Sequence, residues 1–168
     1  MTTRKRADIV LVERGIFESR AQAQSAIKAG LVSVDGEPLR KTSGTIAPDA
    51  RITAEKPHPY VSRGGVKLAA ALDAFGIDPA GLVACDLGAS TGGFSDVLLQ
   101  RKAAKVYAVD VGHGQLHPRI AADARVVAME GRDARSLDRD VIAEPVDLVV
   151  ADVSFISLRL VIPPVIPL

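Results

Sequence analysis

"CDLGASTGGFSD", Cys85 to Asp96, is the stretch that decides the fold. It continues an apolar run and then turns through glycines, which is typical of a strand that leads through a tight loop into a helix. Three ligand chemistries fit its spacing. Read from Gly88 to Gly92, the motif G-x-S-x-G fits the nucleophile elbow of a serine hydrolase. Read on to Gly93, it fits the loop of a dinucleotide-binding site in which Ser90 replaces the middle glycine. The third possible ligand is a nucleoside without phosphate groups.

Four short apolar runs predict the strands of the second half of the chain. They are "LVACDL", "KVYAVDV", "RVVAM" and "VDLVVAD", each as long as a buried strand, with room for crossover helices between them. This alternation is typical of a parallel, doubly wound α/β sheet of the Rossmann type. Such sheets bind ligands beyond the carboxyl ends of their strands. The residues at those ends are Asp86, Asp110 and Asp152.

The three possible ligands require different partner residues. A serine hydrolase of this fold needs a histidine late in the chain, but His58, His113 and His117 all precede the fourth apolar run. In a dinucleotide loop the middle glycine lets the backbone approach the pyrophosphate, whereas Ser90 stands there and Asp86 would repel a diphosphate. A ligand with an ammonium group, an adenine and ribose hydroxyls would instead favour these carboxylates. S-adenosylmethionine is such a ligand.

Separate segments are expected to bind separate parts of S-adenosylmethionine. Asp110 lies 22 residues beyond Gly88 (110 − 88 = 22), close to the offset of about 20 at which an acidic residue meets ribose hydroxyls in this fold. Asp133, in "MEGRDAR", is expected either to accept from the adenine amino group or to cap a helix. The turn is expected to hold the methionine end through Asp86, Gly88, Ser90, Gly92 and Gly93.

The composition predicts a soluble, cytoplasmic protein. Of the 168 residues 48% are hydrophobic, and the single cysteine excludes an internal disulfide. No signal peptide follows Met1, and the apolar stretch from Val146 is broken by charged residues before it reaches the ~20 residues of a membrane helix. We therefore expect neither a membrane nor a metal partner.

Charge is divided unevenly along the chain, although the net charge is only +1. Residues 1–67 hold 12 Lys and Arg against 7 Asp and Glu (12 − 7 = +5), and residues 68–168 hold 9 against 13 (9 − 13 = −4). A basic front half predicts contact with a polyanion, unless its charges are merely a solvated surface.

The basic front half has the pattern of a small helical module with a hairpin. Ser19 and Gln22 form a capping box at the start of the predicted helix "RAQAQSAIKAG", and Gly30 ends that helix. A shorter helix is predicted in "RADIVLVERGIF". A tight hairpin turn is predicted at Asp35-Gly36. The run "ESRAQAQSAIKAGLVSVDGEPL" resembles the RNA-binding domain named after ribosomal protein S-four, over about residues 4–55. The resemblance implies that Arg6, Arg20 and Lys28 face RNA.

The order of motifs after this module resembles one family in particular. "SRGGVKLAAAL", "CDLGASTGGFSDVLLQ", "VYAVDVGHGQL" and "VVADVSFISL" are similar to the TlyA (hemolysin A) family of ribosomal RNA 2′-O-methyltransferases, whose catalytic domain is of the FtsJ type. The resemblance implies methylation of a cytidine ribose in ribosomal RNA by S-adenosylmethionine. It also implies a catalytic Lys-Asp-Lys-Glu set, of which Lys67 and Asp152 are the first two members. The second Lys and the Glu have no counterpart in these residues.

The expected domains are an RNA-binding domain at residues 1–55, a linker at 56–63 and the first part of a methyltransferase domain at 64–168. Since a sheet of this type normally continues past its fourth strand, the chain is expected to be a C-terminally truncated fragment without turnover of its own. Two other functions stay open. One is a non-catalytic RNA-binding protein with a degenerate nucleotide-binding domain, and the other is a membrane-active hemolysin.

Overall fold

The computed structural model describes residues 4–168 and divides into two compact units between Pro59 and Tyr60. We call the part up to Pro59 the first unit and the part from Tyr60 the second unit. The division falls inside the segment 56–63, whose assignment as a linker stays a prediction, as do the domain limits at residues 55 and 64.

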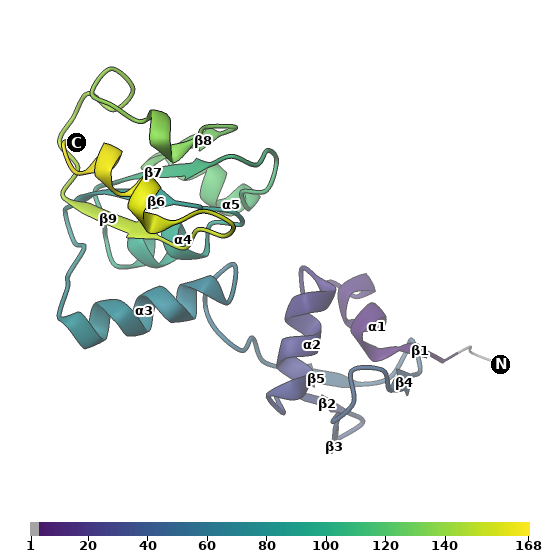
Figure 1. Ribbon diagram of the computed structural model, residues 1–168. Helices are drawn as coiled ribbons and strands as arrows, with labels where there is room; N and C mark the ends of the chain where they lie inside the picture. Colours follow the sequence, from purple (N-terminus) through teal and green to yellow (C-terminus); the bar gives the residue numbers. More distant parts are fainter. Residues whose placement is uncertain (1–3) are drawn as a thin grey trace. The chain divides into compact units, whose positions relative to one another are not determined.

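The first unit packs two short helices beside small antiparallel sheets (Figure 1). Strand β2 pairs with β3 on one side and with β5 on the other, and β1 pairs with β4. One buried cluster, which includes Leu11, Phe17, Ile27 and Val32, joins helices and strands. The elements are β1 (Lys5–Arg6), α1 (Ala7–Glu13), α2 (Arg20–Lys28), β2 (Val32–Val34), β3 (Glu37–Pro38), β4 (Thr45–Ile46) and β5 (Ile52–Ala54).

Local sequence signals set the ends of these elements. The Ser19 hydroxyl accepts a hydrogen bond from the Gln22 backbone N–H and caps α2, while the Gln22 side chain accepts from the Glu18 N–H. In the β2–β3 turn Asp35 and Gly36 have φ of +52° and +88°, which is the left-handed pair that a two-residue hairpin requires. The predicted helices and hairpin of the first unit are confirmed.

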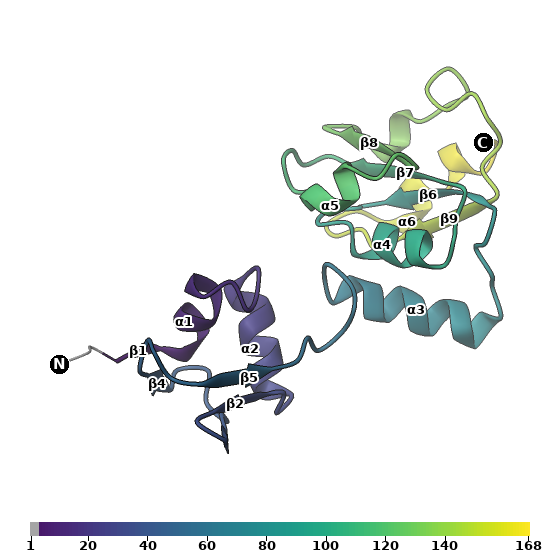
Figure 2. The same cartoon turned by 180° about the vertical axis from the view of Figure 1, so that it is seen from behind.

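The second unit is built on a four-stranded parallel sheet with the order β8-β7-β6-β9 (Figures 1 and 2). The chain moves outward from β6 to β8 and then returns to the other side of β6, so the order reverses between β6 and β9. The α/β fold predicted from the four apolar runs is confirmed. The elements are α3 (Gly64–Phe75), β6 (Val83–Leu87), α4 (Gly93–Gln100), β7 (Lys105–Asp110), α5 (Pro118–Ala121), β8 (Val126–Glu130), η1 (Ala134–Ser136), β9 (Leu148–Ala151), α6 (Leu158–Val161) and η2 (Pro163–Val165).

Separate hydrophobic cores cover the two faces of this sheet. Helices α3, α4 and α5 lie on one face, and η1, α6 and η2 on the other, as the opposite views of Figures 1 and 2 show. Successive residues of β6 alternate between the two faces, because side chains of a strand point in opposite directions in turn. Ala84 therefore packs toward α4, whereas Cys85 and Leu87 pack toward α6. Asp86 shares the face of Ala84.

The connection from β8 to β9 differs from the crossover helix for which the sequence has room. It contains only the short 3₁₀ turn η1. The Asp138 carboxylate accepts hydrogen bonds from the backbone N–H groups of Asp140 and Val141, and Pro145 follows, so acidic side chains and proline favour turns over a helix here. Across residues 4–168 no helix has the length and apolar character needed to cross a membrane.

Candidate functional site

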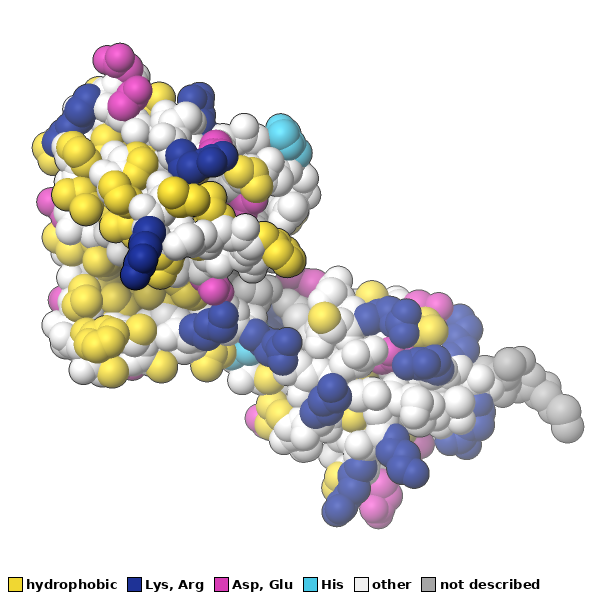
Figure 3. Space-filling model, in the orientation of Figure 1, with side chains coloured by type: hydrophobic (Ala, Val, Ile, Leu, Met, Phe, Trp, Pro, Cys, Tyr) yellow, Lys and Arg dark blue, Asp and Glu magenta, His cyan; other side chains and the backbone are white. Residues whose placement is uncertain are grey.

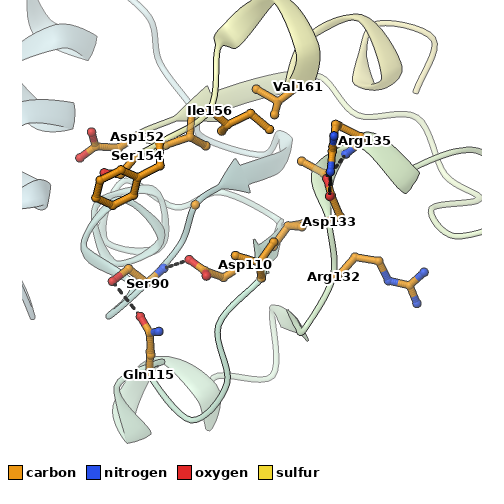
Figure 4. Close-up of a pocket in the computed structure, with 16 residues that line it drawn as sticks. Ser90, Asp110, Gln115, Arg132, Asp133, Arg135, Asp152, Ser154, Ile156 and Val161 are labelled. Atoms are coloured by element: carbon orange, nitrogen blue, oxygen red, sulfur yellow. Dashed lines mark hydrogen bonds and ion pairs between the residues drawn. The ribbon is translucent and has the colours of Figure 1, made fainter.

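A cavity of about 510 Å³ opens at the carboxyl ends of the strands in the second unit (Figure 4). Its volume is within the range of small-molecule sites, and it lies where the strand order reverses, which is the usual binding position in such sheets. Segments that follow β6, β7, β8 and β9 all contribute to its walls. The lining residues are Gly88, Ser90, Val109, Asp110, Val111, Gln115, Arg132, Asp133, Ala134, Arg135, Asp152, Val153, Ser154, Phe155, Ile156 and Val161.

The turn after β6 is closely packed and conformationally demanding. Gly88 has φ of +79°, and a Cβ there would lie 2.9 Å from the Asp152 carbonyl oxygen, so only glycine fits. Ser90 also has a positive φ of +48°, which is uncommon for a residue with a side chain. Its hydroxyl donates to the Gln115 Oε1 atom at 3.3 Å, and no histidine lines the cavity in the described part of the chain. Among the described residues, the cavity lining therefore contains no imidazole of the kind that activates the serine of a serine hydrolase.

Asp110, the last residue of β7, ties two loops of the cavity together. Its Oδ2 accepts from the Ser90 backbone N–H at 2.7 Å (Figure 4). Its Oδ1 accepts from the Gly112 backbone N–H, also at 2.7 Å. Each carboxylate oxygen can accept a second hydrogen bond. The carboxylate can thus hold the loops in place and still receive the hydroxyl groups of a ligand in the cavity.

Asp133 lies in the cavity wall beyond β8 and already has strong partners. It caps η1 by accepting from the Arg135 backbone N–H, and it pairs with the Arg135 guanidinium at 2.6 Å. The side-chain hydrogen bond from Arg135 is the main cause that lowers the pKa of Asp133 to about 2. The capping role considered from the sequence is therefore present, and contact with an adenine amino group stays a prediction.

Asp86, Gly92 and Gly93 do not line this cavity. Gly92 is the N-cap residue directly before α4 and has φ of +91°, and a Cβ on it would lie 2.8 Å from a methyl group of Leu116. A Cβ on Gly93 would come 3.0 Å from the Gly65 backbone nitrogen. These two glycines permit close packing around the start of α4, so any contribution to cofactor binding would act through the shape of the turn.

Asp86 is completely buried under that turn. The Ser95 hydroxyl donates to its Oδ2 at 2.7 Å, while among residues 4–168 its Oδ1 has no hydrogen-bond partner. Burial, reinforced by the negative charges of Asp110 and Asp152, raises the pKa of Asp86 to about 7 although the Ser95 bonds oppose the change. Asp86 is therefore a buried polar group whose hydrogen-bonding capacity the described residues satisfy only in part.

The buried acid predicts a pH effect on stability. Because the pKa of Asp86 rises from 3.8 when unfolded to about 7 when folded, the folded protein binds the extra proton between these values. The free energy of unfolding should therefore fall as the pH rises from 4 to 7, by a few kcal/mol in total, and then stay level. Asp86→Asn, which removes the titration, should flatten this slope in thermal melts of the chain at a series of pH values. If the free energy of unfolding changed equally with pH in both proteins, burial would not raise the pKa of Asp86.

Lys67 and Asp152, the predicted catalytic residues, are brought together across 85 positions of sequence. Lys67 is on α3 and Asp152 directly follows β9; the Lys67 Nζ lies 3.0 Å from one carboxylate oxygen of Asp152 and 3.2 Å from the other. The two side chains are 68% and 44% exposed, so the pair is open to a large substrate. Asp152 also lines the cavity, which places the ion pair at its edge.

Sequence reasoning missed several residues that complete the cavity. Gln115 contacts Ser90, and Arg132 lies in the wall beside Asp133 (Figure 4). The segment 153–156 also contributes, including Phe155, which is fully exposed and has φ of +65°. These residues share one signal that could have found them, since each lies in a loop that directly follows a predicted strand.

The three predicted RNA-facing residues lie in the first unit, whose visible face in Figure 3 carries many Lys and Arg side chains. Arg6 precedes α1 and Arg20 opens α2, and both guanidiniums pair with the carboxylate of Asp8. Lys28 is in the last turn of α2 and borders a shallow hollow with Arg40. Within residues 4–168 no group of three or more His, Cys, Asp or Glu residues is arranged to hold a metal ion.

Comparison with known protein families shows to which family the second unit belongs. Residues 60–168 match the FtsJ-like methyltransferase family over the whole sheet and its cavity. The chain belongs to the FtsJ-like methyltransferase family. Residues 5–52 match the S4 domain, so an S4 domain precedes the FtsJ-like domain, as the sequence analysis expected.

Two curated relatives match this chain over most of its length. A 16S/23S rRNA (cytidine-2'-O)-methyltransferase TlyA of Mycobacterium tuberculosis is 48% identical over 165 residues, which are 97% of this chain and 62% of the relative. Hemolysin A of Brachyspira hyodysenteriae is 40% identical over 159 residues, which are 94% of this chain and 66% of the relative. These relatives confirm the predicted resemblance to the TlyA family.

A solved structure of a hemolysin candidate from Streptococcus thermophilus supports the fold of this FtsJ-like chain. It has a TM-score of 0.66 and 38% sequence identity, and the match covers 98% of this chain and 62% of the other. The chain therefore spans about three fifths of the length of the relatives that it matches.

Proposed function

We propose that this protein methylates the 2′-hydroxyl of a cytidine ribose in ribosomal RNA with S-adenosylmethionine as the methyl donor. The observation that carries the proposal is the Lys67–Asp152 ion pair at the edge of the cavity, in an FtsJ-like domain that follows an S4 domain. The M. tuberculosis relative named for cytidine 2′-O-methylation supports the choice of substrate. The test is transfer of a labelled methyl group to ribosomal RNA by a hybrid in which residues 1–168 replace the matched part of the M. tuberculosis relative, with the modified nucleoside identified by mass spectrometry.

The cavity fits S-adenosylmethionine better than a dinucleotide. Asp110, Asp133 and Asp152 line it, and Asp86 lies buried below the turn with one oxygen that lacks a donor among the described residues. Asp133 and Asp152 are paired with Arg135 and Lys67, and Arg132 also lines the cavity, so the preference for a cationic ligand with hydroxyl groups over a diphosphate rests mainly on the Asp110 carboxylate. Asp110 would bind ribose hydroxyls and the Gly88 to Ser90 turn would enclose the methionine end. When bound, S-adenosylmethionine supplies a methyl group made electrophilic by its sulfonium.

Lys67 and Asp152 provide the groups that handle the substrate hydroxyl. A ribose 2′-hydroxyl is a poor nucleophile, so it must be held in line and lose its proton as it attacks. Lys67 would orient or deprotonate that hydroxyl, and Asp152, which contacts both the lysine and the cavity, would fix the position of the ammonium group. The Lys67 position on α3 is set by helix packing, which gives the pair a rigid support on one side.

We propose that the protein acts in the cytoplasm, where ribosomal RNA is found. The first unit would supply the affinity for RNA. Its exposed guanidinium and ammonium groups can pair with phosphates and release counterions. Paired substitution Arg20→Ala and Lys28→Ala should weaken binding to ribosomal RNA and reduce the slope of log affinity against log salt by about 1.5. Filter-binding titrations at several salt concentrations measure both. An unchanged slope would remove these two residues from the interface.

A further inference from the structure

We infer that Asp8 is a positioning residue that fixes the directions of the Arg6 and Arg20 guanidiniums, so that the two act as one rigid phosphate clamp. The inference rests on the proposed role of the first unit in RNA binding. It concerns how these arginines are presented, since an acidic residue at the centre of an RNA-binding face would otherwise only weaken the attraction.

The geometry of the three side chains carries this inference. Asp8 is fully buried, whereas the side chains of Arg6 and Arg20 are 45% and 55% exposed. Arg6 binds the carboxylate with two parallel bonds, from Nε to Oδ1 at 3.0 Å and from Nη2 to Oδ2 at 3.1 Å. Arg20 donates to Oδ2 from Nη2 at 2.9 Å and from Nε at 3.3 Å. The acid thus lies beneath the surface and the guanidiniums above it.

The carboxylate is held as firmly as the arginines. The Gln24 amide also donates to its Oδ2, at 2.7 Å, from one turn further along α2. The hydrogen bond from Arg6, followed by those from Gln24 and Arg20, holds the pKa of Asp8 well below its usual range, so the group stays charged. Asp8 is on α1 and Arg20 on α2, so the network also fixes the starts of the two helices against each other.

Enough donors remain on both arginines to bind a polyanion. A guanidinium has five N–H groups, and each of these uses one on Nε and one on Nη2 toward Asp8, which leaves three (5 − 2 = 3). The fork of an arginine binds phosphate oxygens best when its plane is already oriented, because less side-chain entropy is lost. The trio keeps a net charge of +1 (two guanidiniums and one carboxylate), so orientation rather than added charge is what Asp8 contributes.

Asp8→Asn separates this role from a purely structural one. An asparagine keeps the shape but places an NH₂ donor opposite the arginine donors, so at least one guanidinium is released while the positive charge of the face increases. Binding of the whole chain to a 23S rRNA transcript is compared with binding to its antisense transcript of equal length. We expect affinity for 23S rRNA to fall at least tenfold, while affinity for the antisense RNA changes less than twofold.

Two further variants make the result decisive. Arg6→Lys with Arg20→Lys keeps both charges and leaves Asp8 in place but removes the planar guanidinium groups. This double variant should therefore lower the ratio of the affinity for 23S rRNA to the affinity for the antisense RNA as much as Asp8→Asn does. Adding Asp8→Asn to it should cause no further drop. If Asp8→Asn does not give a folded protein by circular dichroism, the lysine pair alone decides the question.

The outcomes distinguish the inference from the proposal on which it rests. If Arg6→Ala with Arg20→Ala leaves binding to 23S rRNA unchanged, the first unit does not bind RNA through these residues and both fail. If that pair weakens binding but the ratio is unchanged in Asp8→Asn and in the lysine pair, only the positioning role fails. Equal loss of affinity for both transcripts in Asp8→Asn would likewise reduce Asp8 to a structural residue.

Discussion

Lys67→Ala should lower the rate constant of methyl transfer by about 100- to 10,000-fold, which is the range by which a positioned acid or base accelerates proton transfer. The assay uses a hybrid in which residues 1–168 replace the matched 165 residues of the M. tuberculosis relative. The affinity for S-adenosylmethionine should change less than threefold, because Lys67 contacts Asp152 and does not line the cavity. The loss should therefore appear in kcat rather than in KM for the cofactor.

A matched lysine variant provides the control for this experiment. Lys102 is exposed in the turn before β7, at the end of the sheet opposite the cavity, and has φ of +64°, which asparagine tolerates. Lys102→Asn should leave the rate within twofold. Lys67→Arg keeps the charge but cannot release a proton near neutral pH, so partial activity in that variant would identify orientation as the role of Lys67. Full activity of Lys67→Ala would remove the residue from the mechanism.

Asp110→Ala should weaken the binding of S-adenosylmethionine by about 10- to 100-fold, as measured by titration calorimetry on the 168-residue chain. The carboxylate is expected to receive ribose hydroxyls, and charge-assisted hydrogen bonds of this kind contribute roughly 1.5–3 kcal/mol. The substitution also removes the two 2.7 Å bonds that hold Ser90 and Gly112, so the cavity loses its fixed shape as well.

Asp78→Ala is the comparison for the cofactor experiment. Asp78 also accepts a backbone hydrogen bond, from Ala80 at 3.0 Å, but it lies before β6, away from the cavity. Its removal should leave the affinity for S-adenosylmethionine within twofold. If both aspartate variants bound the cofactor as the unchanged chain does, the assignment of Asp110 to the ribose would be wrong.

The sequence predicted the fold of this chain well because its signals are local and strong. The four apolar runs became β6 to β9. Strands β6 and β7 are buried on both faces, as continuous apolar character predicts, whereas β8 at the edge of the sheet is largely exposed. Asp35 and Gly36 form the predicted hairpin turn with positive φ, and Ser19 caps α2 as predicted. The connection after β8 was harder to predict, since only the detailed bonding of Asp138 shows why it forms turns.

The candidate site was predicted in part, and the limits have a physical origin. Residues at the carboxyl ends of strands, such as Asp110 and Asp152, could be placed because parallel strands bring their ends to one edge. Whether an acid faces the cavity or the core depends on which face of the strand it occupies, and this placed Asp86 in the interior. Pairing across the fold, such as that of Arg20 with Asp8, depends on packing that no local pattern contains.

The most direct test of the proposed function is methyl transfer by the hybrid protein to ribosomal RNA. Labelled S-adenosylmethionine is the donor, the RNA is digested to nucleosides, and mass spectrometry identifies the product, with the M. tuberculosis relative as the positive control. The account predicts 2′-O-methylcytidine from the hybrid and at least a 100-fold lower yield in the initial phase when Lys67 is replaced by alanine. A methyl group found on a base instead of a ribose, or no transfer by a folded hybrid, would contradict it.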